Sequence, residues 1–145
     1  MTELLARGAP LVSVAVLDAS KRTIGAWPGL IDPGAARTAI PWKCRKLLRV
    51  EPERLEPLAA FDPRCPTGRY PVYLVHLRAR SLEPVLLEVV AIPRLKRVLL
   101  GRDFLQGHVF AYDGAGGEGT VAWFGLRPSS PELRPSLKKF FDDDS

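Results

Sequence analysis

Apolar residues in this chain fall into short runs that are separated by proline, glycine and charged residues. The run Leu11–Leu17 (LVSVAVL) is apolar and rich in β-branched residues on both of its faces, as in a buried strand. Tyr70–Ala79, Val85–Ile92 and Val98–Leu100 have a similar character. The 14 prolines and 12 glycines cut the chain into pieces of this length, which is typical of strands joined by turns. The pattern predicts an all-β fold.

Two short helices are expected between the strands. Pro41 opens a segment, Lys43–Val50, that we expect to be helical, because proline fits the first turn of a helix. A second helical turn is expected after Gly101, ending near Gln106. Residues 51–68 have little hydrophobic periodicity, and we expect a loop or an irregular hairpin there.

The C-terminal part of the chain changes in composition. Val109–Tyr112 and Thr120–Phe124 flank a glycine-rich stretch and predict a hairpin. After Gly125 proline and serine become frequent, and the chain closes with KKFFDDDS. We therefore expect one domain over residues 1–125 and a flexible tail over residues 126–145. A docking segment is the alternative, because the two phenylalanines of the tail would then have a surface to pack against.

Length and composition are those of a soluble domain. The chain has 145 residues, of which 46% are hydrophobic and 26% charged, enough for one core. No uncharged stretch approaches the ~20 residues that span a bilayer, so no membrane contact is expected. The N-terminal segment has an acidic Glu3 and no basic region before its apolar run. We therefore expect no signal peptide and a cytoplasmic location.

The net charge of +5 permits nucleic-acid binding without requiring it. The basic residues are interspersed with acidic ones, and the best basic cluster is Arg45, Lys46 and Arg49 beside Trp42. Nucleic-acid grooves combine cations with stacking aromatics. We favour a solvated helix face here and keep nucleic-acid binding as a lesser alternative.

The cysteines and histidines do not predict a metal site. Cys44 and Cys65 do not form a C-x-x-C pair, and a reducing compartment favours free thiols. His76 and His108 are far apart in sequence and lie in apolar runs. A tetrahedral metal site needs more ligands at closer spacing. We expect neither metal nor cofactor.

The strongest chemical signal is a carboxylate at a tight turn. The apolar segment Ile24–Ile31 ends at Asp32, and the chain then turns through Pro33 and Gly34. One carboxylate cannot both activate water and protonate a leaving group. Two that share a proton can, because like charges about 3 Å apart do not both ionise. The second turn must therefore come from another subunit.

Two motifs carry a resemblance to a known family. The pattern Leu30-Ile31-Asp32-x-Gly34-Ala35-x-x-Thr38-x-Ile40-Pro41 resembles the active-site turn of retropepsins and of their bacterial single-domain relatives. Further along, Val98-Leu-Leu-Gly-Arg-Asp-Phe-Leu105 resembles their second signature, two hydrophobic residues and a glycine before a short helix. Ala111–Gly114 is similar to the strand and turn that often follow. The resemblance covers roughly Leu11 to Trp123.

The resemblance implies a retropepsin-like closed β-barrel with one or two short helices, and an aspartic endopeptidase that works as a homodimer on peptide or protein substrates. In that family Asp32 would be the catalytic residue, paired with Asp32 of the second subunit. The other residues that it assigns to the site are the active-site loop residues Pro33, Gly34 and Ala35, the flap candidates Pro66, Thr67 and Gly68, and the structural supports Leu99, Leu100, Gly101, Arg102 and Asp103.

Two positions depart from the family pattern. Family members have Thr or Ser where this chain has Pro33, and proline has neither the hydroxyl nor the N–H that would lock two active-site loops together. Retroviral members have an acid where this chain has Ala36, so Arg102 needs another partner, with Asp103 and Asp18 as candidates. The alternative function is therefore a catalytically inactive member of the fold that dimerises or binds peptide.

Overall fold

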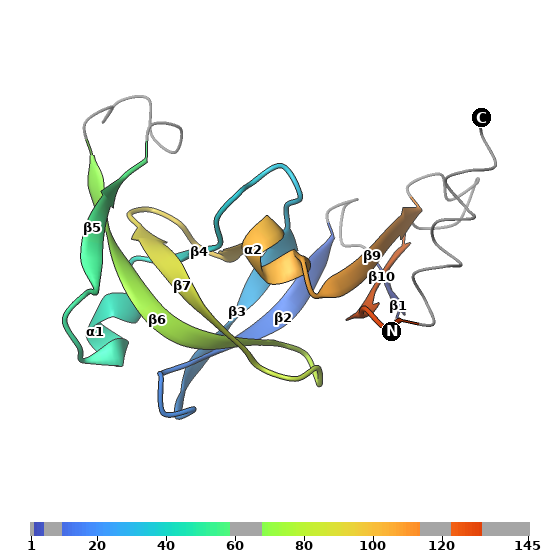
Figure 1. Cartoon of the computed structure of the whole chain (residues 1–145), viewed down its shortest axis with the longest axis horizontal. Helices are drawn as coiled ribbons and strands as arrows, with labels where there is room; N and C mark the ends of the chain where they lie inside the picture. Colours follow the sequence, from blue (N-terminus) through green and yellow to red (C-terminus); the bar gives the residue numbers. More distant parts are fainter. Residues whose placement is uncertain (1, 5–9, 59–67, 114–122, 132–145) are drawn as a thin grey trace.

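The computed structural model describes residues 2–4, 10–58, 68–113 and 123–131. Within these residues the chain forms ten strands and two short helices (Figure 1). In chain order the elements are β1 (Thr2–Leu4), β2 (Leu11–Leu17), β3 (Thr23–Ile31), β4 (Ala39–Pro41), α1 (Cys44–Leu48), β5 (Arg54–Pro57), β6 (Arg69–Ala79), β7 (Val85–Ile92), β8 (Val98–Leu100), α2 (Arg102–Leu105), β9 (His108–Asp113) and β10 (Trp123–Pro128).

Six of the strands close into a barrel. Neighbouring strands pair in the order β2-β3-β8-β4-β7-β6, and β6 pairs with β2 to complete the ring. β5 pairs with Arg69–Val72, the part of β6 that precedes its pairing with β2, and β1, β10 and β9 form a second, three-stranded sheet. Because a closed barrel has no free edges, its backbone hydrogen bonds are satisfied internally. The prediction of an all-β closed barrel with two short helices is confirmed.

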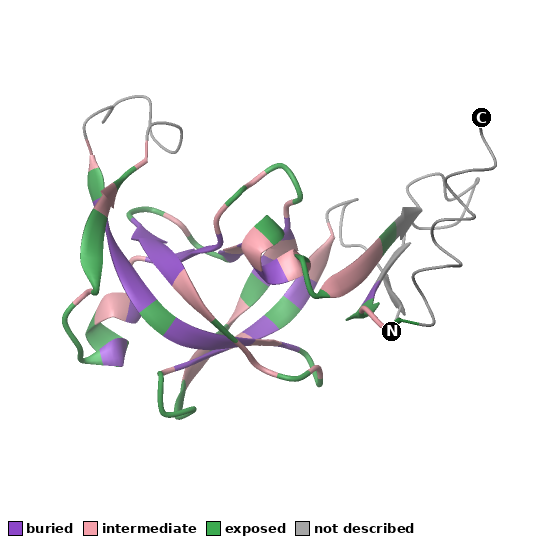
Figure 2. Ribbon diagram, in the orientation of Figure 1, coloured by how far each residue is buried: buried purple, intermediate pink, exposed green. Residues whose placement is uncertain are grey.

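The barrel interior is filled by the apolar runs that the sequence predicted as strands. Buried residues concentrate in β2, along most of β6 and in the second half of β7 (Figure 2). In β2 the side chains of Val12, Val14 and Val16 are buried, whereas Ser13 between them is exposed. Phe104 of α2 is also fully buried and packs into the same core. Helix α2 is therefore fixed against the barrel.

Two pairs of parallel strands bring the sequence motifs together. β3 runs parallel to β8, with Ile31 opposite Leu100, so both strands end at the same edge of the sheet. β4 runs parallel to β7 and antiparallel to β8. The β3–β4 connection lies beside α2 at this end of the barrel (Figure 1). The pairing therefore places the turn that follows β3 against the residues that follow β8.

The structure adds elements that the hydrophobic pattern did not predict. β1 and β4 have three residues each, too few for a periodic signal. β5 lies in the segment expected to be a loop or irregular hairpin, and it pairs antiparallel with β6. β10 ends at Pro128, beyond the domain end expected at Gly125, and the tail from residue 132 lies outside the described residues. Neither α1 nor α2 is long enough to cross a membrane, and no other helix occurs among the described residues.

Candidate active site

Asp32 directly follows β3 and is held in a tight turn. Its backbone N–H donates to the carbonyl oxygen of Leu100 at 3.0 Å, which continues the β3–β8 pairing by one residue. Its carboxylate oxygen Oδ1 accepts a hydrogen bond from the Gly34 N–H at 3.1 Å, and its carbonyl accepts from the Ala35 N–H at 3.1 Å. The Asp32 side chain is partly exposed, whereas Pro33 and Gly34 are exposed. The turn therefore presents one oriented carboxylate.

Gly101 lies directly beneath the turn. The residue is buried, and a Cβ atom placed on it would lie 2.6 Å from the carbonyl oxygen of Arg37 and 2.9 Å from that of Ala35. The next residue, Arg102, donates its backbone N–H to the Ala35 carbonyl at 2.8 Å. Only a glycine allows the two backbone segments to approach this closely.

Thr38 and Asp103 join the two motifs through side chains. Thr38 is fully buried, and its Oγ1 donates to Asp103 Oδ1 at 2.5 Å and accepts from the Gly101 N–H at 3.0 Å. The Thr38 N–H donates to Asp103 Oδ2 at 3.1 Å, and the Phe104 N–H donates to Asp103 Oδ1 at 2.8 Å. The Thr38 hydroxyl and both carboxylate oxygens of Asp103 therefore have partners, as buried polar groups require.

Sequence reasoning named both residues of this link without pairing them. Thr38 entered as part of the first motif, and Asp103 entered as a structural support of the second. The signal that could have joined them is a short polar side chain directly before two apolar residues in each motif, with Ala39-Ile40 after Thr38 and Phe104-Leu105 after Asp103. Such residues need a buried partner.

The arginines around the turn have partners that differ from the expected ones. Arg102 donates from Nη1 to the carbonyl oxygen of Pro33 at 3.0 Å, rather than pairing with Asp103 or Asp18. It is Arg37 that approaches Asp103, with 3.9 Å between Nε and Oδ2, and Arg37 Nη1 also lies 2.6 Å from Glu56 Oε2. The sequence did not reveal the pairing of Arg37 with Glu56, because it depends on the position of the exposed strand β5 next to the segment that contains Arg37.

The remaining expected site residues lie at two places. Leu100 is fully buried and Leu99 is partly buried, both on β8 beneath the turn. Of the flap candidates, Gly68 directly precedes β6 and is partly buried. Pro66 and Thr67 lie outside the described residues.

The cysteine and the two histidines of the described residues are buried or hydrogen-bonded within the fold. Cys44 is buried, and burial raises the pKa of its thiol to about 12. The Nδ1 atoms of His76 and His108 lie 3.0 Å from the carbonyl oxygens of Asp18 and Phe104, respectively. Burial lowers the pKa of His108. Among the described residues no three His, Cys, Asp or Glu side chains gather as a metal site would need.

No protein-family model and no curated protein matches the chain. Solved structures that are similar to it include a retropepsin-like aspartic protease from Rickettsia conorii, with 10% identity, a TM-score of 0.49, and 87% of this chain and 91% of that one covered. The simian foamy virus (mac) protease has 16% identity, a TM-score of 0.47, and coverage of 66% and 91%. The EIAV protease in complex with the inhibitor HBY-793 has 16% identity, a TM-score of 0.44, and coverage of 68% and 86%.

The sequence motifs and the topology agree on the fold. The first motif forms the turn after β3, the second forms β8 and α2, and hydrogen bonds join them at one end of the barrel. With these two motifs at the end of a closed six-stranded barrel, the chain has a retropepsin-like fold.

Proposed function

We propose that this chain is one subunit of an aspartic endopeptidase, in which two copies bring their Asp32 turns together. The observation that carries the proposal is the fixed, partly exposed Asp32 carboxylate at the turn between β3 and β4. Asp32 forms no ion pair with a residue in the described ranges. A lone carboxylate that is oriented and accessible is half of an acid pair.

The second half would come from Asp32 of a second copy. Two carboxylates in contact would share one proton, because the repulsion between their charges makes it unfavourable for both to be ionised. The ionised carboxylate would take a proton from a bound water as that water attacks the peptide carbonyl. The protonated carboxyl would donate to the carbonyl oxygen, and the roles would reverse as the amine leaves. Neither a metal nor a cofactor enters this chemistry.

The substrate would be an extended peptide segment held over the pair of turns. The segment that leads from β5 to β6 is our candidate for the flap, and it contains the flap candidates Pro66, Thr67 and Gly68. β5 ends at Pro57 and β6 begins at Arg69, and the two strands pair in register. Paired strands on both sides of this segment would support a flap from its base.

The proposal keeps two expectations from the sequence. Residues 1–125 would contain the protease domain, with β10 extending it to Pro128, and the following residues would be a tail. The location would be cytoplasmic, and the free thiol of buried Cys44 is compatible with a reducing compartment.

A specific observation favours the alternative, a dimerisation or peptide-binding module without catalysis. Pro33 offers no hydroxyl and no N–H to a second loop. Its carbonyl oxygen accepts a hydrogen bond from Arg102 within the same chain. The contact between two turns would then lack reciprocal hydrogen bonds, and the acid pair would be held less firmly.

Peptide cleavage tests the proposal. The unmodified chain should cleave unfolded protein substrates best at acid pH, and a pepstatin-like statine inhibitor should block the cleavage. Asp32→Asn should abolish it, because both copies then lose the carboxylate that accepts the proton of the attacking water. Glu83→Gln is the matched control, since Glu83 is exposed in the β6–β7 turn and should leave the rate unchanged.

Two results would overturn the enzymatic proposal. Cleavage that survives in Asp32→Asn would exclude Asp32 as the catalytic acid. A stable dimer that cuts nothing across the pH range would favour the binding module instead.

A further inference from the structure

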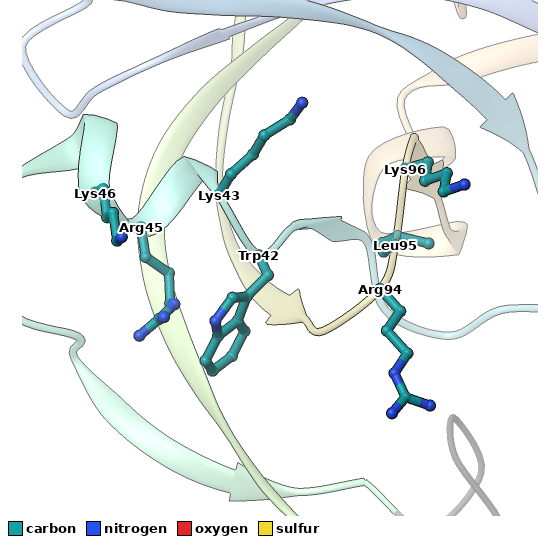
Figure 3. Close-up of a pocket in the computed structure, with 7 residues that line it drawn as sticks. All are labelled: Trp42, Lys43, Arg45, Lys46, Arg94, Leu95 and Lys96. Atoms are coloured by element: carbon teal, nitrogen blue, oxygen red, sulfur yellow. The ribbon is translucent and has the colours of Figure 1, made fainter.

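A basic groove lies beside the ends of β4 and β7, and none of its lining residues belongs to the Asp32 turn. β4 and β7 are parallel neighbours, and their last residues, Pro41 and Ile92, are opposite each other. The segments that follow therefore leave the sheet at the same edge. They line an open groove of about 760 Å³ (Figure 3). Trp42, Lys43, Arg45 and Lys46 come from the first segment, and Arg94, Leu95 and Lys96 come from the second.

The groove carries positive charge that the fold does not neutralise. Five of its seven lining residues are lysine or arginine. None of the five forms an ion pair with a carboxylate in the part of the chain that the structure describes. Arg37 and Arg54, by contrast, both pair with Glu56. Like charges gathered in one hollow repel each other and attract an anionic partner.

Arg45 and Trp42 give the groove a fixed geometry. The Arg45 guanidinium carbon lies 3.4 Å from the centre of the Trp42 ring, a stacked cation–π contact. Arg45 Nε is buried and has no hydrogen-bond partner among the described residues. A buried N–H donor of a guanidinium calls for an acceptor, and a carboxylate fits its planar fork. The groove therefore combines an oriented cation with apolar surface from Trp42 and Leu95.

The chain itself contains a segment of complementary composition. Phe140 and Phe141 are followed directly by three aspartates, Asp142 to Asp144, outside the described residues. Two aromatic side chains next to three carboxylates match a groove of five cations with Trp42 and Leu95. From Pro131 to Asp142 an extended chain spans up to roughly 36–40 Å. That length is on the order of the diameter of a domain of this size.

We propose that the basic groove is a docking site for the acidic segment formed by residues 140–144 of this chain. The carboxylates pair with the lysines and arginines of the groove, and the phenylalanines pack on its apolar surface. A single-stranded nucleic acid is the competing ligand. It is less well matched, because its binding needs a basic track along several nucleotides, whereas this groove has the size of a few side chains. The inference is independent of whether the Asp32 turn is catalytic.

Zero-length cross-linking of the full chain tests the docking. A carbodiimide joins a carboxylate to a lysine amine only where the two are in direct contact. Three of the four lysines in the described residues line the groove, and the fourth, Lys21, lies in the exposed β2–β3 turn. Mass spectrometry should find Asp142–Asp144 joined to Lys43, Lys46 or Lys96, and those links should disappear in D142N/D143N/D144N. Links to Lys21 at equal yield, or none to the groove, would overturn the proposal.

A binding measurement gives a second, independent readout. A labelled peptide of residues 136–145 should bind the full-length D142N/D143N/D144N variant, whose own tail no longer competes. Adding Lys43→Glu and Lys46→Glu should weaken that binding at least about tenfold, whereas adding Lys21→Glu should not. Raising the salt concentration should weaken it as well, because exposed charges are screened. The proposal is wrong if the charge reversals have no effect, or if a mixed-sequence oligonucleotide binds the groove more tightly than the peptide at the same salt concentration.

Discussion

Gly101 is the residue on which the packing of the Asp32 turn depends most directly. Its backbone angle φ is −85°, which any residue adopts, so the requirement for glycine is one of space. The atoms that a Cβ would meet at 2.6–2.9 Å belong to the backbone of Arg37 and Ala35, on the segment that holds the turn. A flexible side chain could move aside, but these carbonyls are fixed by the barrel.

Gly101→Ala should therefore destabilise the protein and displace the turn. Forcing a methyl group into this contact should lower the free energy of unfolding by about 1–3 kcal/mol. Urea denaturation measures the loss. Gly107→Ala is the matched control, because a Cβ there meets nothing within 4 Å, and its effect should stay within about 0.5 kcal/mol. Equal stability of the two variants would refute the packing account.

At the scale of elements, ion pairs tie β5 to the rest of the sheet. Arg37, in the connection after the Asp32 turn, pairs with Glu56 on β5. Arg54, on the same strand, pairs with both Glu56 and Glu88, and Glu88 lies on β7. Hydrogen bonds from Arg54, together with the charge of Arg37, lower the pKa of Glu56. Glu56 therefore links the strand at the base of the candidate flap to the segment that holds the turn.

This link predicts a pH dependence of stability. A carboxyl whose pKa is lowered in the folded state stabilises the fold above the unfolded pKa, near 4.5, and loses that contribution as pH falls through the folded pKa. Glu56→Gln should lower stability at pH 7 modestly, because its partners are partly exposed. It should also flatten the decline in stability below pH 5, as followed by thermal unfolding.

Glu83→Gln serves as the control for this measurement, since Glu83 is exposed and pairs with no described cation. Its stability should decline with acid as steeply as that of the unmodified chain. If Glu56→Gln has the same slope as the control, the link does not contribute to acid sensitivity.

The strands with continuous apolar runs could be predicted from the sequence. β2, β7 and β8 have the predicted bounds, because each is a mainly apolar run that places most of its side chains in or against the core. β4 has only three residues and β5 is largely exposed, with Arg54 and Leu55 facing solvent, so neither has a recognisable pattern. These short strands depend on pairing with β7, β8 and β6, which are distant in sequence.

The same division holds for the site. The order of the residues in the two motifs was enough to predict the turn and its support. Thr38, Arg37 and Arg102 have their partners 65, 19 and 69 positions away in sequence, at Asp103, Glu56 and Pro33, respectively. These contacts follow from the barrel register. The basic groove also depends on register, because its two walls meet only where β4 and β7 end together.

At the scale of the whole molecule, the proposed enzyme depends on how firmly two copies hold each other. Pro33→Thr would restore a hydroxyl and an N–H at each turn. Two reciprocal hydrogen bonds at about 0.5–1.5 kcal/mol each should tighten the dimer by about tenfold. Sedimentation equilibrium measures the change. Pro93→Thr is the control, because Pro93 is also exposed but follows β7, and it should leave the dissociation constant unaltered.

A chain that stays monomeric at high concentration, with or without Pro33→Thr, would contradict the proposal of a shared acid pair. A dimer that is equally tight in both proline variants would mean that the hydrogen bonds lost at Pro33 do not limit assembly.

The hydrogen bond from Arg102 to Pro33 joins residues that are 69 positions apart, and the one from Gly101 to Thr38 spans 63. Contacts of such long range form late, after the intervening chain has been ordered. During synthesis the Asp32 turn therefore has no support until β8 and α2 have been made. A nascent chain would contain Asp32 before it contains the residues that orient the carboxylate. A fragment that stops short of residue 100 would therefore lack an oriented Asp32 and show no cleavage.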